Sequence, residues 1–267
     1  MDIRGKVALI TGAAGGIGKG AAEKCLEMGM KVAIADIQEE LGQKTCEELS
    51  KLGECRFYYI DLRNMDEVKA LVPKVVEDFG TIDVLINNAG VPNRLPVEDV
   101  TLQAYEDMFA IHVRSGFFLS QAVGPIMKEK RWGRIINLSS PRGIQPDLIH
   151  PLYGMCKAAV RSMTEYFAMA YARWNIRVNA VSPACIYTPM TEHYRGTEGH
   201  AKAMKQLPAG EYMEIPDLSN VIWFLISDDS LPVNGTTIEA DMGVHLTSLL
   251  SFGQFEKQGH PTSYLEE

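Results

Sequence analysis

The chain has 267 residues, of which 46% are hydrophobic and 22% are charged, a balance typical of a globular protein with a sizeable core. Its formal net charge of −8 argues against nucleic acid as a partner, because phosphate binding needs clustered lysine and arginine. No apolar run reaches the length of a membrane span, and the first residues show no signal-peptide pattern. We therefore expect no membrane partner and a cytoplasmic protein.

The five cysteines are scattered and form no Cys-x-x-Cys pair, and the six histidines show no ligand spacing. This pattern predicts reduced thiols and no metal site.

Short apolar runs alternate with longer segments of helical periodicity. The runs that predict strands are 7–11, 32–36, 57–61, 84–87, 134–138, 177–182 and 236–239. The segments that predict helices are 18–28, 39–52, 65–79, 102–128, 153–173 and 218–227. The strand runs are continuously apolar, which is typical of a sheet covered on both faces. The alternation predicts one α/β domain, a Rossmann-type doubly wound sheet of seven parallel strands with helices on both faces.

Three segments need separate interpretation. The long helix at 102–128 contains Pro125 near its end, where we expect a bend or break. Residues 188–213 are polar and contain several prolines and glycines, which predicts a mobile flap over the substrate rather than a domain boundary. We expect the catalytic domain to span residues 1–243, and residues 244–267 to be a C-terminal extension of it.

A glycine-rich loop with the sequence TGAAGGIG lies at 11–18, between the first predicted strand and the first predicted helix. Glycines such as Gly12, Gly16 and Gly18 permit a sharp turn and a close approach of the backbone to phosphates. The helix that follows offers unpaired N–H groups to a pyrophosphate. In this context the loop predicts a dinucleotide site, with a purely structural turn as the alternative.

Asp36 ends the second predicted strand, 18 residues after Gly18. A carboxylate there can accept hydrogen bonds from the adenosine ribose, and it would repel a 2′-phosphate. No arginine or lysine at 13–15 or 37–38 would neutralise that phosphate. The sequence therefore favours NAD over NADP, although Asp36 could also be an ordinary exposed residue at a strand end.

Tyr153 and Lys157 are four residues apart in a predicted helix, which puts both side chains on one face. An ammonium beside a phenol favours the phenolate, so the phenol can exchange a proton with an alcohol. The Tyr-x-x-x-Lys pattern alone is common by chance, and a surface pair is an equally good interpretation.

Two further motifs accompany this pair. The sequence NNAG at 87–90 follows the fourth predicted strand, and Ser140 precedes Tyr153 by 13 residues. With the glycine loop and the Tyr153–Lys157 pair, these motifs make the chain resemble the classical short-chain dehydrogenase/reductase family from about residue 6 to about residue 243. Unrelated proteins do not carry all of these motifs in this order.

The resemblance implies an NAD-dependent oxidoreductase that interconverts a secondary alcohol and a ketone by hydride transfer. It implies that Tyr153 is the general acid/base, that Lys157 binds the nicotinamide ribose and lowers the pKa of Tyr153, and that Ser140 holds the substrate oxygen. The residues that it and the phosphate loop assign to the cofactor are Gly12, Gly16, Ile17, Gly18, Asp36, Asp61, Leu62, Asn88, Ala89, Gly90, Tyr153, Lys157, Ile186 and Thr188.

The chain departs from the family pattern at His112, where the family has an asparagine thought to hold a water that links the lysine to solvent. A histidine can also bind water, so we include His112 in the catalytic set, and its titration near neutral pH would make the relay pH-dependent. A packed helix histidine without a catalytic part is the alternative. Two smaller departures are Ala184 and Met242, at positions where the family has glycine.

The substrate is less well defined. The pocket residues expected from the fold include Arg142, Arg94, His150 and Tyr187, together with Gln145. A guanidinium at Arg142 would pair with an anionic group, and this polar set favours a sugar, polyol, hydroxy acid or sulfonate. Arg142 could instead face solvent or an internal acid, which leaves hydroxysteroids and other apolar alcohols open.

The motifs leave two other functions to consider. A low-turnover NAD(H)-binding protein is the alternative from another class, and an epimerase or dehydratase is disfavoured because the chain lacks the extra substrate domain of those longer relatives. The resemblance further implies a homotetramer or homodimer with helices 102–128 and 153–173 between subunits. The apolar residues of the extension could cover a neighbour's active site or pack on their own subunit.

Overall fold

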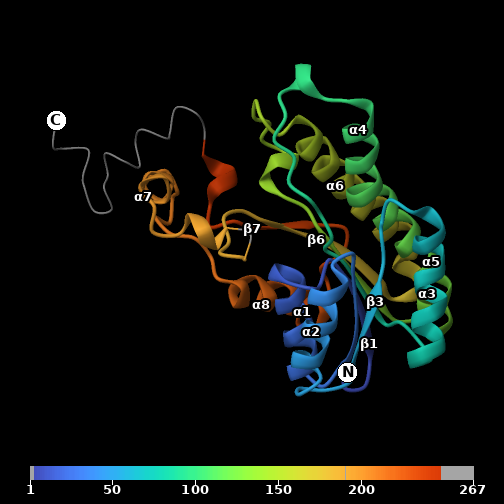
Figure 1. The fold of residues 1–267 in the computed structure, drawn as a ribbon. Coiled ribbons are helices and arrows are strands. Elements are labelled where there is room, and N and C mark those ends of the chain that lie inside the picture. Colours follow the sequence, from blue (N-terminus) through green and yellow to red (C-terminus); the bar gives the residue numbers. More distant parts are fainter. Residues whose placement is uncertain (1–2, 190, 248–267) are drawn as a thin grey trace, which may run out of the picture.

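The computed structural model describes residues 3–189 and 191–247 (Figure 1). All seven predicted strands are present, and they form one parallel sheet in the order β3-β2-β1-β4-β5-β6-β7. The strands are β1 (Val7–Thr11), β2 (Lys31–Asp36), β3 (Cys55–Tyr59), β4 (Val84–Asn87), β5 (Gly133–Leu138), β6 (Ile176–Pro183) and β7 (Thr237–Ala240).

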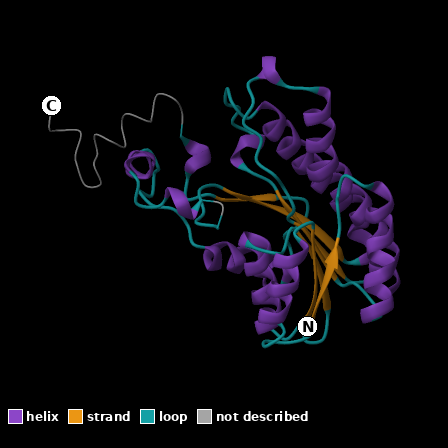
Figure 2. Cartoon of the chain, viewed as in Figure 1, coloured by secondary structure: helices purple, strands orange, loops and turns teal. Residues whose placement is uncertain are grey.

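Helices cover both faces of the sheet, as predicted (Figure 2). One face carries α1 (Gly16–Glu27), α2 (Glu39–Leu49) and α8 (Ile215–Ile226), and the other carries α3 (Met65–Phe79), α4 (Leu102–Phe109), α5 (Ser115–Lys130) and α6 (Pro151–Tyr171) (Figure 1). The fold is a single Rossmann-type α/β domain. No helix in the described ranges is both long and apolar enough to cross a bilayer.

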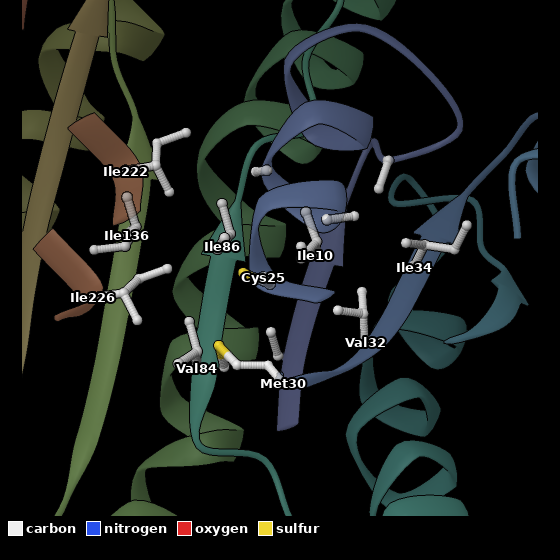
Figure 3. Packing of buried hydrophobic residues seen from close by; sticks show 14 of the residues in the cluster. Ile10, Cys25, Met30, Val32, Ile34, Val84, Ile86, Ile136, Ile222 and Ile226 are labelled. Atoms are coloured by element: carbon white, nitrogen blue, oxygen red, sulfur yellow. The ribbon is translucent and has the colours of Figure 1, made fainter. Parts of the chain in front are cut away.

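The core consists of two layers, because successive side chains of a buried strand point to opposite faces. Ile10, Ile34 and Ile86 pack with the α8 residues Ile222 and Ile226 on the α1 face (Figure 3). Residues next to them in the same strands pack against α3, α5 and α6 on the opposite face. Full burial of each such side chain contributes about 1.5–3 kcal/mol to folding, which fixes the register of the strands that position the site.

The predicted helix at 102–128 is interrupted, but not at Pro125. A π-helical turn at Ala110–Arg114 separates α4 from α5, with the N–H of Ser115 bonded to the carbonyl of Ala110, five residues earlier. Helix α5 continues through Pro125 to Lys130, so of the bend or break predicted at the proline, the break is wrong. The extra residue in the turn places His112 on the side that faces α6.

The segment predicted as a flap has more structure than expected. It contains α7 (Glu198–Lys205), and its two ends are joined where Tyr187 N donates to Met213 O at 3.0 Å and Met213 N donates to Cys185 O at 3.0 Å. These bonds make the segment a closed loop beside the carboxyl end of β6 (Figure 1).

The strand order reverses between β1 and β4, since the chain moves outward from β1 to β3 and returns to the other side of β1 at β4. Loops that leave the carboxyl ends of neighbouring strands at such a point diverge and leave a crevice, where ligands bind in open α/β sheets. The glycine loop follows β1 and the NNAG motif follows β4, so both border this crevice.

Candidate active site

The glycine loop needs glycine for two measurable reasons. Gly12 and Gly16 have φ angles of +65° and +56°, in the left-handed region that favours glycine. A side chain at Gly12 would place its Cβ 2.6 Å from the Cα of Ala89, and one at Gly18 would place its Cβ 2.3 Å from the carbonyl oxygen of Gly12. The loop is therefore folded tightly against the NNAG segment.

Asn88 holds this loop in shape. Its amide nitrogen donates to the carbonyl oxygens of Thr11 and Gly12, at 2.9 and 2.8 Å. Both hydrogens of the amide group are thereby engaged. The side-chain donors of Asn88 therefore act on the backbone of the loop that is predicted to bind the cofactor.

The loop fits a pyrophosphate. Helix α1 begins after Gly15 with no side-chain cap, so its first N–H groups are available to an anion. A Cβ on Gly15 would meet no protein atom within 4 Å, which shows open space above the loop. Thr188, predicted to contact the far end of the cofactor, lies 3.8 Å from the Cβ position of Gly16. The two segments expected to hold the cofactor are thus adjacent.

Asp36 lies buried at the end of β2, against the same loop. Its carboxylate oxygens accept hydrogen bonds from the backbone N–H groups of Ala14, at 2.9 Å, and Gln38, at 3.0 Å. These bonds fix the carboxylate at the carboxyl edge of the sheet, where the sequence predicts the adenosine ribose.

Three other residues that were predicted to contact the cofactor, Asp61, Leu62 and Ile186, already have partners within the protein. The carboxylate of Asp61 forms an ion pair with Arg63, at 2.7 Å between Oδ2 and Nη2. Leu62 and Ile186 are buried apolar residues, and Ile186 belongs to the bridge that closes the flap segment. Asp61 therefore presents an already paired carboxylate, and Leu62 contributes mainly to the core.

The structure brings Ser140, Tyr153 and Lys157 together at the carboxyl end of β5 and the start of α6. The Nζ atom of Lys157 is 5.4 Å from the centre of the Tyr153 ring, and it donates to the carbonyl oxygen of Leu138 at 2.6 Å. Ser140 lies close enough to the Tyr153 hydroxyl to lower the pKa of that phenol. Three of the four residues of the predicted catalytic set, Ser140, Tyr153 and Lys157, are therefore adjacent; the fourth is His112.

The pKa values differ from the prediction. Burial raises the pKa of Tyr153, while the Ser140 hydrogen bond and the charge of Arg142 lower it by less. Lys157 is buried, which lowers the pKa of its ammonium to about 8. The pKa of Tyr153 therefore lies above its ordinary value rather than below it, and the ammonium of Lys157 donates to Leu138 O.

His112 lies buried in the π-helical turn, between the NNAG segment and Tyr153. Its Nε2 atom is 3.1 Å from the N atom and 3.0 Å from the O atom of Val91, and its ring meets that of Tyr153 edge-on at 5.5 Å. Burial, followed by the charge of Lys157, lowers the pKa of His112 to about 3. The predicted titration of His112 near neutral pH is therefore wrong.

A small cavity of about 10 Å³ lies behind the catalytic residues, lined by His112, Lys157, Asn87 and residues of α5 and β5. Nδ1 of His112 and Oδ1 of Asn87 are buried without a hydrogen-bond partner in the described protein. A buried site of this size with polar partners can hold one water molecule.

Comparison with known proteins identifies the family. The family model described as enoyl-(acyl carrier protein) reductase matches residues 12–245. The 3-oxoacyl-(acyl-carrier-protein) reductase FabG of Thermotoga maritima is 36% identical over 245 residues, which cover 91% of this chain and 99% of the relative. The chain belongs to the classical short-chain dehydrogenase/reductase family.

Other members show how varied the substrates of these dehydrogenases are. The 7alpha-hydroxysteroid dehydrogenase of Bacteroides fragilis is 34% identical over 243 residues, which cover 90% of this chain and 94% of the relative. A solved structure of NAD+-bound xylitol dehydrogenase has a TM-score of 0.83 at 30% identity, and covers 90% of this chain and 99% of that one. This short-chain dehydrogenase/reductase is accordingly an oxidoreductase that binds a nicotinamide cofactor and acts on small-molecule alcohols or ketones.

The predicted substrate residues of this family member are only partly brought together. Arg142 and His150 lie on the loop between β5 and α6, and both contact Asp147, which sequence reasoning missed. Arg94 is exposed on the loop after β4. Tyr187 bonds His200 inside the flap segment, at 2.8 Å between its hydroxyl and Nε2.

The C-terminal segment of the dehydrogenase packs on its own subunit as far as it is described. The side-chain nitrogen of Gln145 donates to the carbonyl oxygens of His245 and Thr247, at 2.5 and 3.0 Å. Gln145 therefore anchors this segment rather than facing a substrate. The rest of the extension, 248–267, lies outside the described residues. The predicted contact of the extension with a neighbouring subunit is therefore not tested.

Proposed function

We propose that the protein is an NAD-dependent dehydrogenase that oxidises a secondary alcohol to a ketone, or catalyses the reverse reduction, with Tyr153 as general acid/base. The observation that carries the proposal is the adjacency of Ser140, Tyr153 and Lys157 at the crevice bordered by the glycine loop. The nicotinamide ring of a bound NAD supplies the hydride acceptor; the protein supplies the binding site and the proton exchange.

Asp36 supports NAD over NADP. Its carboxylate is fixed by Ala14 N and Gln38 N at the sheet edge, and a 2′-phosphate there would meet a buried negative charge. The glycine loop and the N-terminus of α1 would hold the pyrophosphate, and Thr188 would contact the nicotinamide end. These residues fit the cofactor in charge and in available space.

Tyr153 would exchange the substrate proton. Because burial raises its pKa, the phenol is protonated at neutral pH and can donate to a developing alkoxide during ketone reduction. Alcohol oxidation needs the phenolate, so we expect its rate to rise with pH. Ser140, whose hydroxyl lies beside Tyr153, would hold the substrate oxygen.

We assign His112 the part of a water-holding residue. With a pKa of about 3 it stays neutral at physiological pH, so it does not pass protons as an imidazolium. Its Nδ1 is buried without a partner, and His112 lines the small cavity that Lys157 also lines. A water there would connect Lys157 to His112 and Asn87, and His112 would then take the role that the family gives to asparagine.

We also propose a homotetramer or homodimer with α5 and α6 between subunits. Phe117 on α5 and Tyr166 and Met169 on α6 are large apolar side chains with exposed fractions of 42%, 68% and 74% in the single chain. An apolar face of this kind is typical of a subunit interface. Sedimentation of Tyr166→Glu, against Leu231→Glu as an exposed control after α8, tests it: only Tyr166→Glu should reduce the mass.

The experiment that tests the proposed function pairs NAD or NADP with a panel of polyols, sugars, hydroxy acids, sulfonated alcohols and hydroxysteroids, and follows NADH or NADPH absorbance. We expect turnover of at least one alcohol with NAD, and a lower kcat/KM with NADP. Turnover with NADP alone would contradict the role of Asp36. Tight NADH binding without turnover of any alcohol or ketone would contradict the dehydrogenase.

A further inference from the structure

Arg142 and Asp147 form an ion pair at the edge of the active site. Nε of Arg142 lies 3.0 Å from Oδ2 of Asp147. The backbone N–H of Arg142 donates to the Ser140 hydroxyl at 3.3 Å, and its carbonyl oxygen lies 2.9 Å from the Cβ position of Gly154, next to Tyr153. The backbone that carries this guanidinium is therefore packed directly against the catalytic residues.

The charge of Arg142 acts on the substrate side of the site. Burial raises the pKa of Tyr153 on α6 and of Cys185 after β6, and Arg142 is among the groups that oppose the rise at both. Tyr153 and Cys185 come from different elements, so Arg142 lies near enough to the space between them for its charge to act on both. A substrate held at the Tyr153 hydroxyl would occupy that space.

Asp147 offsets this charge. Its carboxylate binds Nδ1 of His150 at 2.8 and 2.9 Å, and it accepts the backbone N–H groups of Ile149 at 3.1 Å and His150 at 2.8 Å. Burial by itself raises the pKa of Asp147. The His150 hydrogen bond and the charge of Arg142, with other bonds, lower it by more, so the pKa lies below its ordinary value. Asp147 is thus ionised at neutral pH, and the Arg142–Asp147 pair has no net charge.

The pair remains rich in hydrogen-bonding groups. The terminal nitrogens of Arg142 have no partner among the described residues, and Nε2 of His150 is left outside the bond to Asp147. Hydroxyl groups both donate and accept, so a polyhydroxylated molecule can use such a set. A carboxylate on the substrate would lose its hydration on binding. It would not recover that free energy from Arg142, because the charge of Arg142 is already balanced by Asp147.

We propose that Asp147 determines the charge preference of the substrate site by neutralising Arg142, so that the enzyme takes uncharged polyols or sugars in preference to hydroxy acids. The inference rests on the proposed alcohol dehydrogenase function and narrows its substrate class. It assigns a specificity role to a residue that does not touch the reacting atoms.

The test measures kcat/KM with NAD for two pairs of probes, galactitol against galactonate and xylitol against xylonate. It uses four proteins: wild type, Asp147→Asn, Arg142→Gln and the double variant. Asparagine removes the charge and keeps an oxygen for the backbone N–H groups. We expect wild type to prefer the alditols. The aldonate-to-alditol ratio of kcat/KM should rise at least about tenfold in Asp147→Asn, fall in Arg142→Gln, and return to within about threefold of wild type in the double variant.

If turnover is too slow to measure, the binding affinities of the same probes give the same comparison. The affinity of each probe for the enzyme–NADH complex, from quenching of NADH fluorescence, should show the same changes in ratio. A wild type that prefers aldonates, an unchanged ratio in Asp147→Asn, or no binding of any probe by any variant would overturn the inference. The proposed dehydrogenase activity has a separate readout, because it is measured as turnover of any alcohol or ketone in the wider panel and does not depend on the aldonate-to-alditol ratio.

Discussion

The imidazole of His112 occupies the space that a side chain at Gly90 would need. A Cβ on Gly90 would lie 2.6 Å from Cε1 of His112 and 3.1 Å from Nδ1. The glycine of the NNAG motif and the unusual histidine of the π-helical turn therefore fit each other. This contact fixes the ring against Val91 on one side and Tyr153 on the other.

Gly90→Ala tests that fit. The ring is buried and cannot swing into solvent, so the added methyl group should displace it and reduce the free energy of unfolding by about 1–3 kcal/mol. Urea denaturation of wild type and variant measures the difference. In a Gly90→Ala, His112→Asn double variant the smaller side chain should recover part of the loss; equal stability of Gly90→Ala and wild type would contradict the packing.

Gly15→Ala tests the position of the cofactor. The added Cβ meets no protein atom within 4 Å, and Gly15 has an extended backbone with φ −162°, so the stability of the protein alone should be unchanged. If the pyrophosphate occupies the space above the loop, the methyl group should weaken NADH binding by about tenfold or more. Thermal unfolding and NADH fluorescence titration measure the two effects. Undiminished NADH affinity would place the pyrophosphate elsewhere.

The low pKa of His112 predicts a pH dependence of stability. The folded protein disfavours protonated His112, whereas the unfolded chain protonates near pH 6.5. Stability from this residue is therefore present above pH 6.5 and is lost as the pH falls toward about 3, by about 1.4 kcal/mol per pH unit. In His112→Asn the loss of unfolding free energy between pH 6 and pH 4 should be smaller by about 2.5 kcal/mol, because the interval spans two pH units. Identical slopes would show that His112 is not neutral in the fold.

Most of the fold was predictable because its signals are local. The buried parallel strands appear as continuous apolar runs, and the loop at 11–18 carries its own turn chemistry. The π-helical turn at Ala110–Arg114 was missed because hydrophobic spacing continues through it, and α7 was missed because the prolines and glycines around it indicate a loop.

The site was predictable to the extent that family motifs mark it. Ser140, Tyr153 and Lys157 were found in this way, and the structure brings them together. The pairing of Asp147 with Arg142 depends on how one loop folds in space, which no motif reports. The three-residue spacing of Asp147 and His150 before α6 was the available signal. Likewise, the pKa of His112 follows from burial and from Lys157, and neither is visible in the sequence.

Asp36→Asn tests cofactor selectivity. Asparagine keeps an acceptor for the bonds from Ala14 N or Gln38 N but removes the charge that opposes a 2′-phosphate. We expect KM for NAD to rise about tenfold and KM for NADP to fall, with little change in kcat. Steady-state kinetics with both cofactors and one alcohol measure this. If the ratio of kcat/KM for NAD over NADP stays at its wild-type value, Asp36 does not discriminate between them.

The most direct test of the central claim compares Tyr153→Phe with wild type in two measurements on the same preparation: the rate of NADH formation from NAD and the best alcohol, and the dissociation constant for NADH. Phenylalanine keeps the ring contact with His112 and removes the hydroxyl that exchanges the proton. We expect kcat to fall by about 100-fold or more while NADH affinity stays within about twofold. A variant that retains wild-type turnover would contradict Tyr153 as the general acid/base.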